Sequence, residues 1–301
     1  MIIANPIYDV VFKYLLEDTE IAKELLSTIL GANISGLQVK PQETLIQGES
    51  GDIKIFHLDF KAVIDLPDGK QKTVLIELQK AKKTYDILRF RKYLGENYSK
   101  EEIRKNKKGK PEGYCLEIVT IYFLGFTLSG VEVPVLKVSR NIQNAITGET
   151  VVAENDFINH LTHECFTIQI PRLAHTQGSK LEEVLAIFSQ DNITDDLHKI
   201  NYTSPPKNPL AKKIIRRLSK AAGNQAIQRI MDTEDLIERL INRETAEKTK
   251  EIEAKLTETE KLLQESEREK EELLQARRES ELEKEALRKQ IETLLKKKND
   301  E

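Results

Sequence analysis

The chain opens with apolar residues at helical spacing. They recur every three or four positions from residue 9 onward, and Gly31 follows the last of them as a residue that ends helices. This pattern predicts one helix over residues 9–30. Its apolar positions are Val10, Val11, Tyr14, Leu15, Leu25, Leu26, Ile29 and Leu30.

Alternation with a period of two replaces helical spacing between residues 53 and 80. The segment IKIFHLDFKAVID (53–65) predicts a strand, residues 66–69 have the composition of a turn, and KTVLIELQK (72–80) predicts the return strand. We therefore expect a β-hairpin, preceded by a short extended segment over 37–47 and a turn over 48–52. In the return strand one face carries Val74, Ile76 and Leu78, and the other carries Leu75, Glu77 and Gln79.

Helical and extended patterns alternate in the next hundred or so residues. A helix is predicted over 85–105, ending in a flexible loop with five cations among residues 104–110. The run EIVTIYFLGFTL (117–128) is almost continuously apolar, as in a central strand buried on both faces. Helix, hairpin, helix and buried strand in this order indicate an α/β fold. Further strands are expected around 132–140 and 164–170, with a helix over 179–189.

The composition changes after the prolines at 205, 206 and 209. A helical region is predicted over 210–240, and beyond Asn242 the chain contains neither Pro nor Gly. Alternate steps of four and three from Ile252 to Leu294 give thirteen positions, of which seven are apolar, so a coiled coil is favoured over a lone solvated helix. We expect a homodimer through this tail. The expected divisions are an α/β domain over 1–204, a helical connector over 205–242 and a coiled coil over 243–301.

Composition and charge narrow the class of protein. With 39% hydrophobic and 32% charged residues, the chain is too apolar for a disordered protein. Residues 242–301 hold 15 Lys or Arg and 18 Asp or Glu and so account for the whole net charge of −3, which leaves local basic patches as the means of contacting nucleic acid. Two cysteines are too few for a disulfide framework, and no signal peptide or membrane span is evident. We expect a soluble, cytoplasmic protein without membrane association.

Two acidic residues stand on either side of the predicted hairpin turn. Asp59 lies in the first strand and Glu77 in the second, and side chains directly opposite on one face are about 5 Å apart. Two carboxylates so placed suit Mg²⁺, which prefers oxygen ligands and promotes phosphodiester hydrolysis. Gln79 shares the face of Glu77, next to this position. The same spacing also fits an ordinary amphipathic hairpin with one face exposed to solvent.

The order of these residues resembles a known family. Asp59, an interval and Glu77-Leu78-Gln79 resemble the D-(x)n-E-x-Q form of the PD-(D/E)XK motif in the recombination-promoting nucleases. The chain is also similar to the nuclease family transposase branch in TIYFLGF (120–126), LTHECFTIQIPRL (161–173) and the charged tail. Two helical segments add to the likeness: the opening Asp9-Val10-Val11-Phe12-Lys13, and Arg89 with the spaced tyrosines Tyr93 and Tyr98.

The resemblance implies both a fold and an activity. The fold would be a three-layer, restriction-endonuclease-like α/β core with a mixed central sheet. The activity would be cleavage of DNA with Mg²⁺ or Mn²⁺ in recombination or transposition, with Asp59 and Glu77 as metal ligands. Gln79 stands where the superfamily usually has lysine, and Lys61 or Lys80 would have to supply the missing charge. The alternative is a catalytically inactive nuclease-fold protein that binds DNA or assembles through its tail.

Further candidates carry two interpretations each. Asp9 is either an additional acidic residue of the site or a helix-start residue. Lys13 and Arg89 either contact DNA phosphates or support the site, or they are solvated surface charges. Tyr93 and Tyr98 either stack on bases or pack their helix on the sheet, and packing is favoured.

Two local clusters complete the set of candidates. Lys107 and Lys108 in the basic loop are candidate phosphate contacts, with a solvated loop as the alternative. His160, His163 and Cys165 have spacing that suits zinc, but the nearby sequence offers no fourth ligand, so a structural strand is favoured there.

Overall fold

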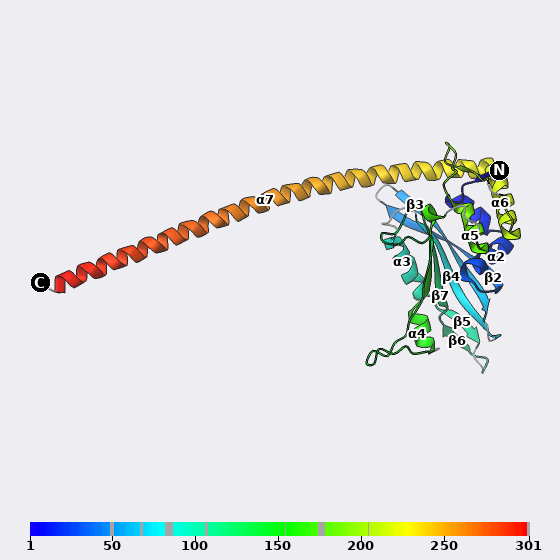
Figure 1. Cartoon of the computed structure of the whole chain (residues 1–301), viewed down its shortest axis with the longest axis horizontal. Helices are drawn as coiled ribbons and strands as arrows, with labels where there is room; N and C mark the ends of the chain where they lie inside the picture. The colour runs from blue at the N-terminus through cyan, green and yellow to red at the C-terminus, as the bar shows by residue number, and fades with distance from the viewer. Residues whose placement is uncertain are drawn as a thin grey trace. The chain divides into compact units, whose positions relative to one another are not determined.

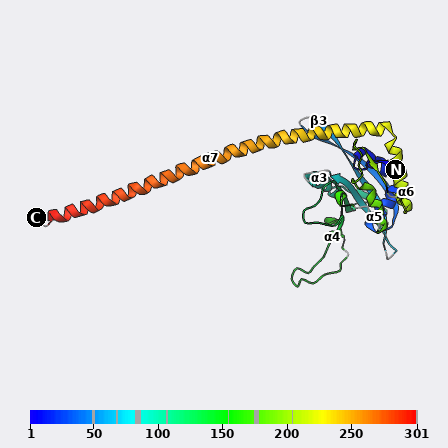
Figure 2. The ribbon, with the colours of Figure 1, turned by 45° about the horizontal axis from the view of Figure 1, so that its top comes forward.

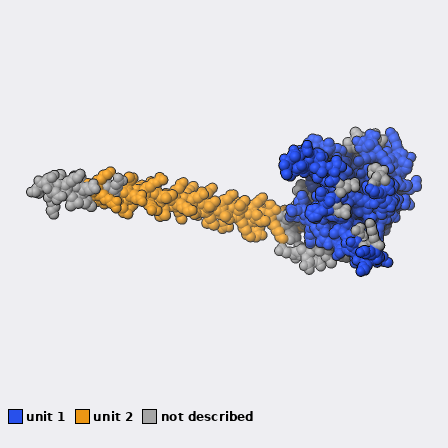
Figure 3. Space-filling model, turned by 90° about the horizontal axis from the view of Figure 1, so that it is seen from below, with its two compact units in different colours: residues 1–234 blue, residues 235–301 orange. Residues whose placement is uncertain are grey.

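The computed structural model describes the backbone of residues 1–48, 51–66, 69–81, 87–105, 108–153, 155–173, 178–203 and 205–299. Side chains are described for these residues except 40–48, 51–59, 77–81, 89, 104, 156, 241, 244, 245, 276, 285, 286 and 290–299. The chain divides into two compact units, residues 1–234 and residues 235–301 (Figure 3).

Helices and strands alternate through the first unit, and one helix runs into the second. In chain order the elements are β1 (Ile2–Ala4), α1 (Asp9–Leu16), α2 (Thr19–Leu30), β2 (Ile34–Gly48), β3 (Gly51–Asp65), β4 (Gln71–Ala81), α3 (Ile87–Tyr98), β5 (Glu102–Lys105), β6 (Pro111–Tyr114), β7 (Glu117–Leu124), β8 (Val135–Val138), α4 (Asp156–Leu161), β9 (Glu164–Gln169), α5 (Lys180–Leu185), β10 (Lys199–Asn201), α6 (Pro209–Ala222) and α7 (Gln225–Asn299). Two short 3₁₀ helices follow β9 and α5, at Ile170–Arg172 and Ala186–Phe188.

A mixed sheet of six strands is the centre of the first unit (Figure 1). Its strand order is β2-β3-β4-β7-β9-β8. β2, β3 and β4 are antiparallel neighbours, β7 is parallel to both β4 and β9, and β8 is antiparallel to β9. The mixed sheet with its helices confirms the predicted α/β class. The predicted hairpin is also present, and the apolar strand β7 lies between two neighbours as a central strand should.

One face of the sheet forms the main hydrophobic core with α1, α2, α5 and α6. Phe123 of β7 is 1% exposed, and its ring centroid lies 5.3 Å from that of Phe12 in α1 and 5.2 Å from that of Phe188. Burial of this apolar surface is the main source of the unit's stability. The hairpin strands contribute Phe60, Ala62, Val74 and Ile76 to the same cluster.

The opposite face of the sheet lies against α3, so helices lie on both sides of it (Figure 1 and Figure 2). Phe90 of α3 stacks on Tyr122 of β7, with ring centroids 4.7 Å apart and an interplanar angle of 19°. Phe90 and Leu124 form a second cluster that is much smaller than the first. Among the described side chains, this face therefore makes fewer apolar contacts than the main core.

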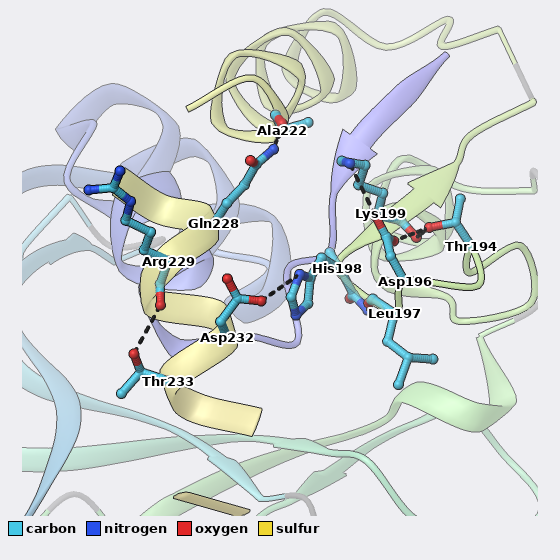
Figure 4. A network of polar contacts seen from close by, with 11 residues as sticks. Thr194, Asp196, Leu197, His198, Lys199, Ala222, Gln228, Arg229, Asp232 and Thr233 are labelled. Carbon is cyan, nitrogen blue, oxygen red and sulfur yellow. Dashed lines mark hydrogen bonds and ion pairs between the residues drawn. The ribbon is translucent and has the colours of Figure 1, made fainter. Parts of the chain in front are cut away.

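Helix α6 and the start of α7 belong to the first unit. Leu210, Ile214, Ile227 and Met231 are members of the main core. The boundary between the units lies after Glu234, inside the segment 205–242 that the sequence suggests as a connector. Two polar contacts hold the start of α7 in this unit (Figure 4). Gln228 Nε2 donates to Ala222 O of α6 at 2.8 Å, and Asp232 lies 3.9 Å from Nδ1 of His198, the residue before β10.

Two helices differ from their predicted extents. The predicted helix over 9–30 is two helices, because the side chain of Asp18 caps a new start by accepting a hydrogen bond from the backbone N–H of Ile21 at 3.2 Å. The predicted helix over 85–105 ends at Tyr98, and residues 102–105 instead form β5, paired with β6. Helical spacing was preserved in both places, so the pattern alone did not show the breaks.

The tail is one continuous helix, as its composition predicted. α7 extends from Gln225 to Asn299 over 75 residues. Within the described part of the chain, no helix is both long enough and apolar enough to cross a membrane.

Candidate functional site

The hairpin of β3 and β4 sets the geometry of the candidate site. The turn begins where Leu66 N–H donates to Lys70 O at 2.8 Å, and Gly69 has a positive φ of 78°, which glycine adopts at little cost. The antiparallel register that follows pairs Asp59 directly with Glu77. Cross-strand partners belong to the same face of a sheet, so both acidic positions share one face.

The neighbouring pairs show which face this is. Phe60 pairs with Ile76 and Ala62 with Val74, and all four are in the main core. Successive strand residues alternate between faces, so positions 59 and 77 belong to the face that lies against α3. Position 79 belongs to it too and pairs with Tyr122. The side chains of Asp59, Glu77 and Gln79 lie outside the described residues.

Thr120 is the register partner of Glu77 on β7. Its side chain is completely buried, and no described residue gives its Oγ1 a hydrogen-bond partner. Burying a hydroxyl without a partner is costly, so this donor beside position 77 is unusual for a packing residue. Sequence reasoning missed Thr120, although it is the one hydroxyl within the apolar segment IVTIYFL (118–124) apart from the Tyr122 phenol.

Lys61 supplies a positive charge on the same face, two positions from Asp59. Its Nζ lies 2.6 Å from Glu102 Oε2 of β5, and both side chains are about a quarter exposed, at 23% and 25%. The hydrogen bond to Glu102 raises the pKa of Lys61 above its ordinary value, so the ammonium stays charged at neutral pH. The ion pair with Glu102 of β5 thus holds the Lys61 ammonium on the strand that also carries Asp59.

Helix α3 covers this face with aromatic side chains. Tyr93 is 2% exposed, in agreement with its predicted role in packing. Tyr98 shares a 2.8 Å hydrogen bond with His163 Nδ1, and burial lowers the pKa of His163, which favours the neutral ring. The side chain of Arg89 lies outside the described residues.

The histidines of the suggested zinc spacing have other partners. Besides the contact of His163 with Tyr98, His160 Nε2 lies 3.0 Å from the carbonyl oxygen of Cys115. Among the described residues, no group of three or more His, Cys, Asp or Glu side chains could hold a metal ion. That statement does not extend to Asp59 and Glu77, whose side chains lie outside the described residues.

Asp9 begins α1, as the helix-start interpretation expects. The backbone N–H groups of Asp9 and Val10 donate to the two carboxylate oxygens of Glu234 at 2.9 and 2.8 Å. α1 packs in the main core, whereas positions 59 and 77 belong to the other face. Lys13 lies half-buried near the end of the same helix.

The described residues of the basic segment, 104, 105 and 108–110, belong to the β5–β6 hairpin rather than to a loop after a helix. Glu102 pairs with Tyr114 and Lys105 with Pro111, and Gly109 has a φ of 74°. Lys108 is exposed there, and Lys107 lies outside the described residues. The hairpin that carries these cations also carries Glu102, the partner of Lys61.

The residue types at the paired positions suit a divalent cation of the magnesium type. Two carboxylates there would offer the hard oxygen ligands that Mg²⁺ and Mn²⁺ prefer. Asp59 and Glu77 are the residues that would hold such an ion.

Comparisons with known proteins found no matching family model, no matching curated protein and no matching solved structure. The likeness to the PD-(D/E)XK nucleases remains a prediction from the order of motifs.

Proposed function

We propose that the protein is a metal-dependent DNA endonuclease of the PD-(D/E)XK type that acts in recombination or transposition. The observation that carries the proposal is the register of the hairpin, in which Asp59 pairs directly with Glu77. Two acids at these positions are costly to keep together unless a cation lies between them. The mixed sheet with helices on both faces is also what a restriction-endonuclease-like core would have.

Each residue of the site has a role in this proposal. Asp59 and Glu77 would hold Mg²⁺ or Mn²⁺, which when bound supplies positive charge beside the phosphodiester and the acidity that activates water. Gln79 would orient water through its amide. Lys61 would stabilise the negative charge that develops on the phosphate, because its ammonium lies on the same face and stays charged. The buried hydroxyl of Thr120 would donate to the carboxylate at 77 and orient it.

The test is nicking of supercoiled plasmid DNA by the full-length protein with Mg²⁺ or Mn²⁺. Asp59→Ala and Glu77→Ala should each lower the rate at least about 100-fold, since even residues that only orient metal ligands can cost 10- to 100-fold. Asp65→Asn is the matched control, because Asp65 lies in the same strand but bonds to Asn33 and Gln71 at the turn end. Equal nicking by all variants would remove the proposal.

The second candidate is a nuclease-fold protein that binds DNA without cutting it. Gln79 favours this alternative, because an amide cannot supply the positive charge of the lysine usual at that position. DNA binding by the wild type with no nicking under either metal would establish it.

We infer further that two copies of the chain pair through a coiled coil formed by α7. The described apolar residues of the four-three seam are between 52% and 74% exposed in the single chain, and pairing would bury them. Basic residues occupy the middle of the seam at 270, 277 and 284. The apolar seam residues are Ile252, Leu256, Leu263, Leu273 and Leu287.

Charges beside the seam favour parallel pairing in register. A parallel dimer places Lys255 opposite Glu260 of the other copy, and Glu283 opposite Arg288. Glu269 directly precedes Lys270 and Glu283 directly precedes Lys284, so two of the three basic seam residues have an acidic neighbour. Removing residues 243–301 should convert the dimer to a monomer, as measured by light scattering. A shortened chain that still has the mass of a dimer would contradict pairing through α7.

A further inference from the structure

Helix α6 carries five cations, and they divide into two groups. Lys213 forms an ion pair with Glu24 of α2. Arg217 lies 3.6 Å from Asp18, donates from Nε to the backbone oxygen of Tyr14 at 2.7 Å, and covers the Tyr14 ring. These two cations are accounted for by acidic or aromatic partners on the neighbouring helices.

The other three cations, Lys212, Arg216 and Lys220, line a cavity of about 470 Å³. This volume is within the range of roughly 300–1,000 Å³ typical of small-molecule sites. All three side chains are exposed, and none has an ion pair with an acid in the described part of the chain. The spacing of four residues places like charges next to one another on one helix face, which is unfavourable unless an anion lies among them.

The remaining wall of the cavity is largely apolar, and the N-terminal ammonium of Met1 already donates to the backbone oxygen of Tyr202 at 2.8 Å. Met1, Pro206 and Ile215 provide the apolar surface. Ser219 lies one turn after Ile215, and its buried Oγ finds no hydrogen-bond partner among the described residues. An unsatisfied buried hydroxyl is a donor in need of an acceptor, here beside three cations.

The backbone N–H groups at the amino end of α6 do not supply the positive charge of the cavity. The carboxylate of Glu183, which is 8% exposed, accepts the backbone N–H groups of Lys207 at 2.5 Å and Asn208 at 2.8 Å. Asn208 Oδ1 in turn accepts from Leu210 N–H at 2.8 Å. Since these donors are satisfied, the charge in the cavity comes from the side chains of Lys212, Arg216 and Lys220.

We propose that the α6 cavity binds the phosphate group of an organic phosphate, either a free nucleotide or a strand of nucleic acid. Lys212, Arg216 and Lys220 neutralise the phosphate, Ser219 donates its hydroxyl, and the apolar wall contacts the attached organic group. Phosphate fits because guanidinium and ammonium groups bind its oxygens with charge-assisted hydrogen bonds. The site is independent of the proposed nuclease centre, since α6 packs on the other face of the sheet.

The test is isothermal titration of the full-length protein with inorganic phosphate, a nucleoside monophosphate and a short DNA duplex. Arg216→Gln should weaken binding of the preferred probe about tenfold, because it removes one charge-assisted contact. Lys213→Gln removes the same charge from the same helix but leaves the cavity intact, so it should change the affinity less than about twofold. Preference for the monophosphate identifies a nucleotide site, and preference for the duplex identifies a strand site.

Ser219→Ala separates a ligand-binding role from a structural one. Removal of an unpartnered buried hydroxyl should leave the melting temperature unchanged or slightly higher, while binding of the preferred probe weakens several-fold. Absence of binding by every probe would overturn the proposal. Equal effects of Arg216→Gln and Lys213→Gln on affinity would overturn it as well.

Discussion

The two faces of the central sheet are built from the same strands and differ in what they bury. The face under α1, α2, α5 and α6 is lined by apolar side chains such as Phe60, Ile76 and Phe123. The face under α3 holds Lys61 and Thr120 and the positions of Asp59 and Glu77. Alternation along β3, β4 and β7 therefore separates the apolar residues of the main core from the polar residues of the proposed site within a single set of strands.

This difference indicates which face of the sheet is the better candidate for a functional site. Polar residues on a solvated face need no explanation, but a fully buried Thr120 without a described partner does. It lies in register with Glu77, which in turn pairs with Asp59. The unusual burial and the acidic pair coincide on one face, and this coincidence supports a functional interpretation.

Substitution of adjacent residues on β7 should show the largest contrast between the faces. Phe123→Ala removes a ring packed on Phe12 and Phe188 and should lower the free energy of unfolding by about 3–5 kcal/mol. Tyr122→Ala removes a half-buried ring stacked on Phe90 and should cost clearly less. Urea denaturation measures both. A larger loss for Tyr122→Ala would reverse the assignment of the faces.

Lys61→Gln tests whether the positive charge on the α3 face serves chemistry or stability. The Lys61–Glu102 pair is partly exposed, so its loss should cost less than about 1 kcal/mol in unfolding free energy. The raised pKa of Lys61 means that this contribution is complete at neutral pH and disappears only as the pH rises through the folded-state value.

Plasmid nicking by Lys61→Gln should nevertheless fall about tenfold or more, because the ammonium would stabilise charge on the phosphate. Lys72→Gln is the matched control, since Lys72 has a comparable ion pair with Glu117. Equal nicking rates for the two variants would assign Lys61 to stability alone.

Thr120→Val should affect function without reducing stability. Valine has nearly the same shape, and the hydroxyl it removes has no partner among the described residues, so the free energy of unfolding should stay within about 1 kcal/mol of the wild type or rise. Nicking should fall several-fold if the hydroxyl orients Glu77. A strong loss of stability with unchanged nicking would make Thr120 an ordinary core residue.

His163 offers the smallest effect, a change in the pH dependence of stability. Burial lowers its pKa, so the folded state binds fewer protons than the unfolded chain below the ordinary histidine pKa. The contribution is complete above that value and decreases as the pH falls toward the folded-state pKa. Between pH of about 7.5 and about 5.5, His163→Gln should therefore show a shallower loss of stability than the wild type. Identical slopes would exclude this linkage.

Much of the α3 face could be anticipated from the sequence. The turn composition at 66–69 fixed the centre of the hairpin, and the alternation around Val74 and Ile76 correctly separated core positions from those of Leu75 and Glu77. The turn residues and the alternation of apolar and polar positions were sufficient to predict this register. A slip of one residue would have moved every core side chain to the other face of the sheet.

Other features depended on caps and tertiary contacts that hydrophobic periodicity does not record. The break between α1 and α2 follows from the cap at Asp18, and the end of α3 from the pairing of β5 with β6. Glu234 binds the start of α1 from a distant part of the chain. The role of Thr120 required knowledge of which strand lies beside β4, since its partner Glu77 is far from it in the sequence.

Divalent-metal binding by the full-length protein tests the central claim most directly. Titration with Mn²⁺ followed by electron paramagnetic resonance should give one ion per chain at this site in the wild type. Asp59→Asn and Glu77→Gln should each weaken it at least about tenfold, and Asp65→Asn should leave it unchanged. Retention of wild-type Mn²⁺ affinity by both Asp59→Asn and Glu77→Gln would contradict a shared ion at the paired positions of the hairpin.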